Sequence, residues 1–200
     1  MSGLEAATTR CGWAGGDPLM QAYHDTEWGV PVRGGRDLYE KLVIDGFQAG
    51  LSWAIILRKR ETTRRAFDGF DPERIARYGE ADIARLLADP GIIRNKAKVN
   101  AAIGNAQAFL AMEERQPGSF SELLWSATGG RPLQNSWAQM SQVPAETPES
   151  QRTSKALKAL GFRFCGPTII YAFMQAVGMV NDHIVSCHRH LPVRELRSKG

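Results

Sequence analysis

The side chains best suited to bind a metal ion are concentrated near the two ends of the 200-residue chain. They are Cys11, His24, His183, Cys187, His188 and His190. His183 and Cys187 are four residues apart, which predicts that both side chains lie on one face of a helix. Cys11 and His24 would complete a set of two thiolates and two imidazoles, which suits zinc and leaves no open position for catalysis. We therefore predict one structural zinc ion per chain.

Spacing alone leaves other interpretations of these residues open. Cys11 and His24 do not form a tight knuckle, so Cys11 as a surface thiol and the histidines as solvated side chains remain alternatives. The grouping at both ends favours a metal, because a clip that closes a long loop contributes most to stability. His188 and His190 are alternative donors. The third cysteine, Cys165, lies in an apolar run and is interpreted as a small core residue.

A carboxylate lies on an apolar stripe of a predicted helix. Leu38, Leu42 and Ala49 recur at helical spacing, and Asp45 falls on the same face. An acid that faces a core is costly unless it is paired or hydrogen-bonded. The helix pattern by itself favours a structural acid over a functional one. The following residues, FQAGLSW, predict a helix break at Gly50, an exposed Leu51 and a new helix capped by Ser52.

Three of the five tryptophans lie close to these features. Trp13, Trp28 and Trp53, together with Tyr23, predict a slot walled by aromatic rings, of the kind that stacks on a planar base. Large aromatic residues also commonly fill cores, which is the competing interpretation. Trp125 and Trp137 are assigned to packing.

A short turn, Asp89-Pro90-Gly91, joins two predicted helices and is followed by Arg94, Lys96 and Lys98. Glycine allows a close approach of the backbone, and the free amides of a helix N-terminus attract phosphate. The segment resembles a helix-hairpin-helix element, which grips the DNA backbone. A generic helical hairpin is the alternative.

Composition is that of one folded domain. Hydrophobic residues make up 43% of the chain and charged residues 23%, and the formal net charge of +4 favours a polyanionic partner. We find no membrane-spanning run and no signal peptide, so we expect no membrane association and a cytoplasmic protein. An odd number of cysteines argues against a disulfide framework.

Strand-like alternation is nearly absent, so we predict an all-α fold. Asp17-Pro18 and Asp71-Pro72 are strong helix-start signals. Helical periodicity covers 36–48, 81–88, 96–115, 120–127, 154–160 and 167–177. We expect a long loop over 129–150, a flexible start over 1–10, a single domain over 11–190 and a basic tail over 191–200.

Four long blocks, in order along the chain, resemble one known family. They are CGWAGGDPLMQAYHDTEWGVP from Cys11, GFQAGLSW from Gly46, GIIRNKAKVNAAIGNA from Gly91 and GFRFCGPTIIYAFMQAVGMVNDH from Gly161. Together they resemble the bacterial DNA-3-methyladenine glycosylase I family. The similarity runs from about Cys11 to Cys187 and so covers nearly the whole chain.

The resemblance implies a helix-hairpin-helix glycosylase fold of two helical lobes, roughly 50–125 and 11–49 with 126–190, in which zinc joins the terminal segments. It implies four zinc ligands, the same residues as above: Cys11, His24, His183 and Cys187. It implies a base pocket formed by Trp13, Tyr23, Trp28, Asp45 and Trp53, with Asp45 as the pocket acid. The implied DNA contacts are Gly50 and Leu51 in the base stack and the Gly91 hairpin, with Arg94, Lys96 and Lys98, on the phosphates.

The activity implied is the removal of 3-methyladenine from double-stranded alkylated DNA by a monomer that leaves an abasic site and does not cut the strand. One departure stands out: the family usually has glutamate where this chain has Asp45. The shorter side chain supports one rival hypothesis, a zinc-stabilised protein that binds alkylation damage without excising the base. Release of the base from methylated DNA separates the two hypotheses.

Overall fold

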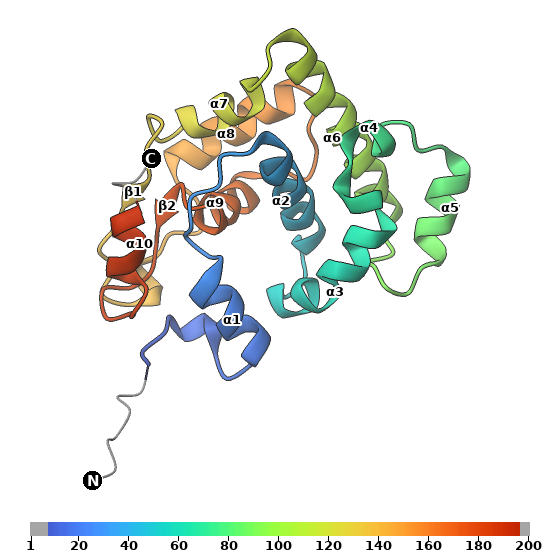
Figure 1. Ribbon diagram of the computed structural model, residues 1–200. Helices are drawn as coiled ribbons and strands as arrows, with labels where there is room; N and C mark the ends of the chain where they lie inside the picture. The colour runs from blue at the N-terminus through green and yellow to red at the C-terminus, as the bar shows by residue number, and fades with distance from the viewer. Residues whose placement is uncertain (1–7, 197–200) are drawn as a thin grey trace.

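The computed structural model describes residues 8–196 as a helical protein (Figure 1). Its α-helices are α1 Pro18–Thr26, α2 Gly35–Gln48, α3 Trp53–Ala66, α4 Pro72–Ile75, α5 Glu80–Ala88, α6 Lys96–Arg115, α7 Ser119–Ser126, α8 Pro148–Ala159, α9 Pro167–Ala176 and α10 His190–Leu196. The fold differs from the all-α prediction by two short strands, β1 Leu133–Gln134 and β2 Val180–Asn181, which pair in parallel. Two residues are too few to leave an alternating pattern in the sequence.

Two of the sequence signals for helix starts are confirmed. The Asp17 carboxylate accepts a hydrogen bond from the Leu19 amide at the start of α1. Asp71 likewise accepts from two amides of the first turn of α4. Ser52 does precede α3, but its side chain makes no capping hydrogen bond, so that part of the prediction is wrong.

The expected long loop over 129–150 is only partly a loop. Helix α8 begins at Pro148, six residues before the predicted start at Ser154, and Thr147 caps it by accepting from the Ser150 amide. Its first turn is polar, so apolar periodicity could not reveal it. The rest of the segment carries β1 and a short 3-10 helix, Met140–Gln142.

Both chain ends are more ordered than predicted. The Thr9 carbonyl accepts a hydrogen bond from the His188 amide, and the Arg10 guanidinium binds Asp25, so these two residues of the expected flexible start are fixed. Residues 1–7 lie outside the described part. The expected basic tail begins as helix α10, and only residues 197–200 of it lie outside the described residues.

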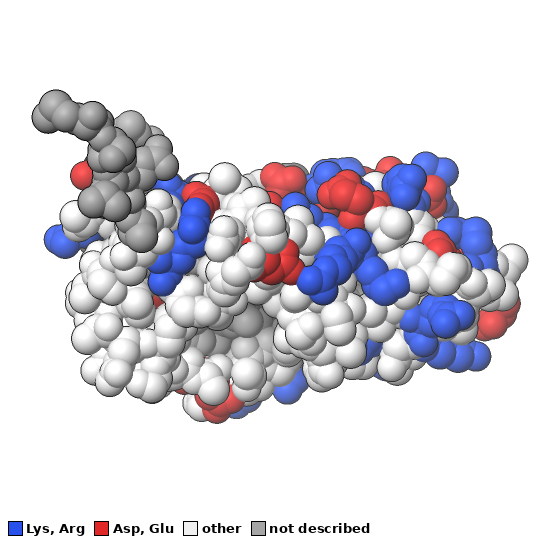
Figure 2. All heavy atoms as spheres, turned by 90° about the horizontal axis from the view of Figure 1, so that it is seen from below, with Lys and Arg blue, Asp and Glu red and all other residues white. Residues whose placement is uncertain are grey.

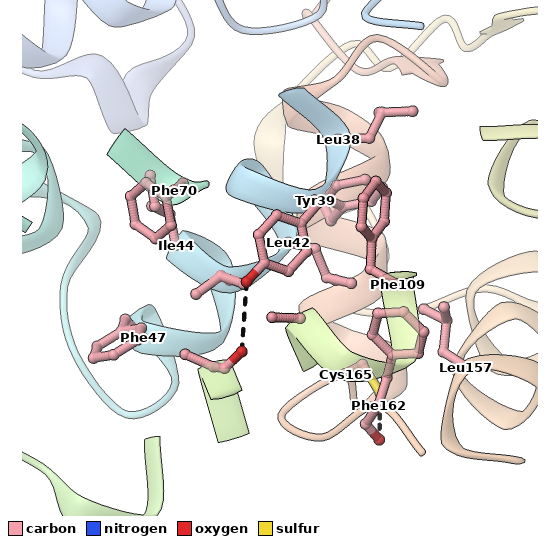
Figure 3. Packing of buried hydrophobic residues seen from close by; sticks show 14 of the residues in the cluster. Leu38, Tyr39, Leu42, Ile44, Phe47, Phe70, Phe109, Leu157, Phe162 and Cys165 are labelled. Carbon is pink, nitrogen blue, oxygen red and sulfur yellow. Dashed lines mark hydrogen bonds between the residues drawn. The ribbon is translucent and has the colours of Figure 1, made fainter. Parts of the chain in front are cut away.

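Helix α2 lies at the centre of the core. It packs against α3, α6 and α9, and Figure 1 places it in the middle of the molecule, between α5 at one edge and α10 at the other. Its buried face carries Leu38, Tyr39 and Leu42, and the Tyr39 ring packs against Phe109 of α6 (Figure 3). Asp45 is buried on the same helix, as the apolar stripe predicted.

The main hydrophobic core draws on residues from Leu38 to Val180, which includes both of the expected lobes. Buried Trp125 belongs to it, as assigned. A second, smaller cluster combines Cys11, Tyr23, Trp28, Leu57, Ala176 and Cys187. This cluster lies where the two chain ends meet α3 and α9. Within residues 8–196, no helix is long and apolar enough to cross a lipid bilayer.

The predicted hairpin is present as α5, a turn and α6. The turn is anchored on α3, because the Lys59 ammonium donates to the Pro90 carbonyl at 2.6 Å and the Thr62 hydroxyl donates to the Gly91 carbonyl at 2.6 Å. A Cβ atom at Gly91 would lie 2.9 Å from Asp89 Oδ1 and 3.1 Å from Thr62 Cβ. Glycine therefore allows the turn to pack closely against α3.

Lys98 has a structural position, which contradicts its assignment as a phosphate contact. The residue is buried, and its ammonium donates to the carbonyls of Phe47 at 2.9 Å and Ala49 at 2.7 Å. Both carbonyls belong to the C-terminal end of α2, where a cation is favourable and unpaired carbonyls need donors. Burial lowers the pKa of Lys98. The sequence pattern of alternating basic residues could not distinguish this inward lysine from its exposed neighbours.

We expect Lys98→Met to lower the free energy of unfolding by about 1–3 kcal/mol, because two buried carbonyls lose their donor. Chemical denaturation followed by circular dichroism measures the change. Lys96→Met, at an exposed position two residues earlier, is the matched control and should leave the stability nearly unchanged. Equal stability of the Lys98 variant and the control would show that the α2 end does not depend on this ammonium.

Candidate functional site

The four residues predicted as zinc ligands lie together. Cys11, His24, His183 and Cys187 are all buried, and their ligand atoms lie within 4.8 Å of one another. The Cys187 sulfur is 3.4 Å from His24 Nε2 and 3.4 Å from His183 Nδ1. The Cys11 sulfur is 3.6 Å from His183 Nδ1. A tetrahedral zinc site with ordinary bond lengths has sulfur-to-nitrogen separations of about 3.5 Å, so the residues fit this metal.

The structure also excludes the alternative donors from this cluster. His188 Nδ1 lies 3.0 Å from the Thr9 carbonyl oxygen, and its Nε2 lies 3.4 Å from Asp25. His190 Nε2 lies 3.0 Å from the Asn135 carbonyl oxygen. Both rings are therefore used to fasten neighbouring backbone, and neither belongs to the ligand cluster.

The helical geometry expected for His183 and Cys187 is wrong. The residues between β2 and α10 form an irregular segment with turns, and α10 begins only at His190. The two side chains still converge, because the turn brings the Cys187 amide within 2.8 Å of the Ile184 carbonyl. A spacing of four residues is compatible with such a turn as well as with a helix.

Outer contacts orient both histidines of the cluster. His24 Nδ1 lies 2.7 Å from Asp25 Oδ1, and the Arg10 guanidinium holds the Asp25 carboxylate with two nitrogen atoms. The bond from Arg10 is the main reason that the pKa of Asp25 is lowered to about 2. His183 Nε2 lies 3.1 Å from the Trp28 carbonyl oxygen. Such partners fix the ring orientation and raise the basicity of a ligating histidine.

The two clustered cysteines have opposite pKa shifts. The Cys11 thiol and the two histidines surround the Cys187 sulfur, and these hydrogen bonds lower the pKa of Cys187. The bond to Cys187, with burial, raises the pKa of Cys11. One thiolate is thus already favoured by the protein, and a metal ion would replace the proton on the other.

A cavity of about 380 Å³ lies beside the cluster. It is lined by Trp13, Met20, Tyr23, Trp28, Lys41, Asp45, Gln48, Trp53, Met140, Ala172, Gln175 and Ala176. All five residues predicted for the base pocket are among them. The volume and the mixture of apolar walls with a few polar groups are typical of a site for a small organic ligand.

The aromatic wall of this cavity rests directly on the histidine pair. The Trp13 and Trp28 rings pack edge to face at 5.0 Å, and Trp28 contacts the His183 ring at 4.6 Å. Trp13 contacts the His24 ring at 5.2 Å. On the other side, Tyr23 lies 5.3 Å from Trp53. The cluster therefore supports one wall of the cavity, and α3 provides another.

Asp45 is a buried acid with one oxygen in use. Its Oδ1 atom accepts a hydrogen bond from the Lys41 ammonium one helical turn earlier, whereas its buried Oδ2 atom has no partner. Burial raises the pKa of Asp45, and the ammonium of Lys41 opposes this rise. An unpaired buried acceptor is costly in free energy, so a bound ligand that donates a hydrogen bond to Oδ2 would remove that cost.

Asp182, the other buried aspartate of the described chain, is fully used. Its carboxylate accepts hydrogen bonds from the side chains of Asn135, Trp137, Tyr171 and Gln175. Those bonds join the segment before α8 to α9 and explain the polar contact of Trp137, which was assigned only to packing. Of the two buried aspartates, only Asp45 has an oxygen available to a ligand.

A second polar atom in the cavity wall lacks a partner. The indole Nε1 of Trp53 is buried and makes no hydrogen bond. Trp53 also lines the cavity with Asp45. The site therefore offers one unpaired acceptor and one unpaired donor between stacked rings, a combination that suits the polar edge of a nucleobase.

Sequence reasoning missed three polar residues of the cavity. Lys41 precedes Asp45 by four residues, so the rule for pairs on one helix face could have found it. Gln48 follows on the same helix, and its side-chain amide donates to the Leu51 carbonyl at 2.6 Å. Gln175 is held by Asp182 from the far end of the chain, and no local pattern indicates it.

Most of the residues expected to contact DNA are at least partly exposed, but some of their polar groups already form hydrogen bonds within the protein. Gly50 is exposed with a positive φ of 78°, and Leu51 beside it is half-buried against the core. Arg94 and Lys96 are exposed at the start of α6. The Gly91 amide, in contrast, donates to Asp89 Oδ1 at 2.6 Å, so it is not a free phosphate ligand as predicted. In Figure 2, which views the molecule from below Figure 1, Lys and Arg side chains gather, with some Asp and Glu among them, on the half that carries α3 and α5.

Comparison with known proteins gives the family. A family model described as methyladenine glycosylase matches residues 13–190. The chain belongs to the methyladenine glycosylase family. DNA-3-methyladenine glycosylase 1 of Escherichia coli (strain K12) is 48% identical over 89% of this chain and 95% of its own length. The DNA-3-methyladenine glycosylase of Haemophilus influenzae is 44% identical, with 90% and 97% of the two chains covered.

Solved structures of the family share the fold. A crystal structure of 3-methyladenine DNA glycosylase I superposes with a TM-score of 0.89 at 49% identity, covering 91% of this chain and 100% of that chain. The enzyme of Staphylococcus aureus gives a TM-score of 0.87 at 34% identity, with 92% and 98% covered. Another structure, a variant in complex with 3-methyladenine, gives 0.86 at 34% identity over 90% and 97%.

We expect Cys187→Ala to remove bound metal and to lower the melting temperature together. The loss should exceed the roughly 2–4 °C that 1 kcal/mol of destabilisation causes in a chain of this size. Elemental analysis of the purified protein and thermal melting measure the two quantities. Cys165→Ala is the control, since Cys165 is buried outside the cluster and should leave the metal content unchanged. Metal-free parent protein would contradict the expectation.

Proposed function

We propose that this protein excises 3-methyladenine from alkylated double-stranded DNA and leaves an abasic site. The observation that carries the proposal is the cavity in which an unpaired acid oxygen and an unpaired indole N–H lie between aromatic walls. Membership of the methyladenine glycosylase family and the relatives named as DNA-3-methyladenine glycosylases support the same activity.

The chemistry demands little acid catalysis. Methylation at N3 leaves the base cationic while it is attached to deoxyribose, so the base is already a good leaving group. When the bond between C1′ and N9 breaks, its electron pair neutralises the departing base. Water supplies the hydroxyl group at C1′, and its remaining proton is released to the solvent. The protein must mainly extrude, recognise and hold the base.

In this mechanism Asp45 acts in recognition. Its Oδ2 atom would accept a hydrogen bond from the amino group of the base, and its charge would stabilise the cation. The indole N–H of Trp53 would donate to a ring nitrogen. Stacking and cation–π attraction by the Trp13 and Tyr23 rings would contribute about 0.5–2 kcal/mol each.

The proposed reaction does not cleave the strand. Cleavage through a Schiff base needs a neutral amine as the nucleophile. The sequence singled out no such lysine. Burial lowers the pKa of Lys41, the lysine that lines the cavity, but its amine is already hydrogen-bonded to the Asp45 carboxylate, which opposes that lowering and occupies the group. Lys41 is therefore assigned a structural role in the pocket and not the role of a nucleophile.

We propose zinc as the metal of the cluster, one ion per chain. Two thiolates and two imidazoles at tetrahedral spacing are the donors that zinc prefers, and four protein ligands leave it no open position. When bound, zinc would crosslink the two terminal segments. Its role would be structural, with no step of the reaction at the metal.

The proposed DNA-binding face combines the turn at Gly50 and Leu51 with the hairpin residues Arg94 and Lys96. Leu51 would fill the gap that the extruded base leaves in the stack, and the exposed cations would bind backbone phosphates. The turn between α5 and α6 would serve as a helix-hairpin-helix element, within a two-lobed fold of that superfamily. We propose that a monomer carries out the reaction.

We expect Asp45→Asn to slow excision of 3-methyladenine about ten- to hundredfold, because a charge-assisted hydrogen bond of roughly 1.5–3 kcal/mol is lost. Single-turnover release of the base from methylated DNA measures the rate. Asp37→Asn, an exposed acid on the same helix outside this cavity, is the control and should behave as the parent. Asp45→Glu restores the length usual in the family and should keep activity if the cavity has room.

Two results would contradict the proposal in different ways. Parent protein that binds methylated DNA but releases no base would support the rival, a damage-binding protein without catalysis. An Asp45→Asn variant as fast as the parent would leave the activity intact but assign Asp45 to structure.

We expect Arg94→Ala with Lys96→Ala to weaken DNA binding and to reduce the slope of log affinity against log salt by about 1–2, since each lost phosphate contact releases one counterion fewer. Fluorescence anisotropy with alkylated and unmodified duplexes at several salt concentrations measures both. Lys155→Ala, an exposed lysine of α8, is the control. An unchanged slope in the double variant would move the DNA contact to another surface.

A further inference from the structure

Lys41 touches both residues that carry the unpartnered polar atoms of the cavity. Its ammonium donates to Asp45 Oδ1, and it lies 4.3 Å from the centroid of the Trp53 ring. The side chain lines the cavity and is only 19% exposed. One cation thus restrains the carboxylate and the indole at the same time, by a hydrogen bond and by attraction to the ring face.

The restraint matters because an aspartate side chain is short. A carboxylate with two free oxygen atoms can rotate about its last bond, and either oxygen can then face a donor. The bond from Lys41 occupies Oδ1 and leaves Oδ2 as the acceptor for a ligand. The same ammonium lies over the ring face of Trp53, which limits the direction of the indole N–H.

We propose that Lys41 is a positioning residue for base recognition, which orients Asp45 and Trp53 and keeps the Asp45 carboxylate ionised within the cavity. The proposal rests on the proposed excision of 3-methyladenine and assigns a further residue to that site. It accounts for a shorter acid at the pocket position, because the paired lysine supplies the fixed orientation that a free aspartate would lack.

The charged groups around Lys41 and Asp45 affect how the excision rate should depend on pH. Lys41 and Asp45 come from α2, and Tyr23 of α1 lies near Asp45. Glu27, which directly follows α1, pairs with Arg60 of α3 near Lys41. Glu27 and Arg60 act on Lys41 in opposite directions. Lys41 itself is the cation that opposes the effect of burial on the pKa of Asp45.

Loss of the Lys41 ammonium should favour the protonated form of Asp45. Burial favours the protonated acid, and a protonated oxygen is a poorer acceptor for the base. Removal of the ammonium should raise the pKa of Asp45 further, because the opposite charge in contact with the carboxylate is lost. Recognition should then be lost at a higher pH than in the parent as the pH falls.

The experiment compares parent, Lys41→Met, Lys41→Arg, Asp45→Asn and the double variant Lys41→Met with Asp45→Asn. Methionine keeps the length without the charge, and arginine keeps the charge. Single-turnover release of 3-methyladenine is measured across the pH range in which each variant stays folded by circular dichroism. In parallel, carbon-13 NMR follows the titration of the Asp45 carboxyl without any ligand.

We expect Lys41→Met to move the acid limb of the rate profile upward by about 1–3 pH units, with the rate largely recovered at high pH. The Asp45 NMR titration should move in the same direction. Lys41→Arg should restore much of the parent profile. In the Asp45→Asn background, Lys41→Met should cause little further loss, because the two residues act as one unit.

An unchanged Asp45 titration and an unchanged acid limb in Lys41→Met would overturn the proposal, as would equal losses from Lys41→Met with and without Asp45. Failure of the proposed function looks different, since the parent itself would release no base. In that case the carboxyl titration, together with quenching of tryptophan fluorescence by free 3-methyladenine at several pH values, still decides whether Lys41 controls Asp45.

Discussion

The convergence of Cys11 and His24 with His183 and Cys187 is the constraint on which the site depends. It joins segments that are more than 150 residues apart, so it fixes where the first helical turns lie relative to α9 and α10. One wall of the cavity rests on this cluster, because Trp13 and Trp28 pack against its histidine rings. The proposed structural metal site would therefore support the cavity wall without taking part in the chemistry.

Asp45 and Trp53 differ from Asp182 and Lys98 in how far the fold satisfies their polar atoms. Asp182 accepts four hydrogen bonds and Lys98 donates two, so each is compensated within the fold. Asp45 and Trp53 each retain a buried polar atom without a partner. Native proteins leave few such atoms, and an unpaired group in a cavity wall is most simply explained by a ligand that completes it.

The positions of the two inward lysines follow from the same principle. Lys98 fastens the end of α2 and so fixes the start of the turn that carries Gly50 and Leu51. Lys41 lies one helical turn before Asp45 on that helix and acts inside the cavity. Helix α2 thus connects the proposed recognition of the base with the proposed entry of Leu51 into the stack. The helix packs against α3, α6 and α9, which fixes the position of Asp45 relative to the turn.

The sequence alone indicated the four clustered Cys and His residues, the five predicted pocket residues that line the cavity, and the helical hairpin, through residue types, spacing and the resemblance to a known family. Helical periodicity predicted the bounds of α2, α5, α6, α7 and α9 to within one residue. It could not determine the turn geometry at His183 and Cys187 or the polar start of α8, since spacing is compatible with more than one backbone. Only the tertiary structure showed that Lys98 points inward while Lys96 does not, and that Lys41 joins Asp45 to Trp53. Those outcomes depend on partners contributed by distant segments, which local sequence patterns do not encode.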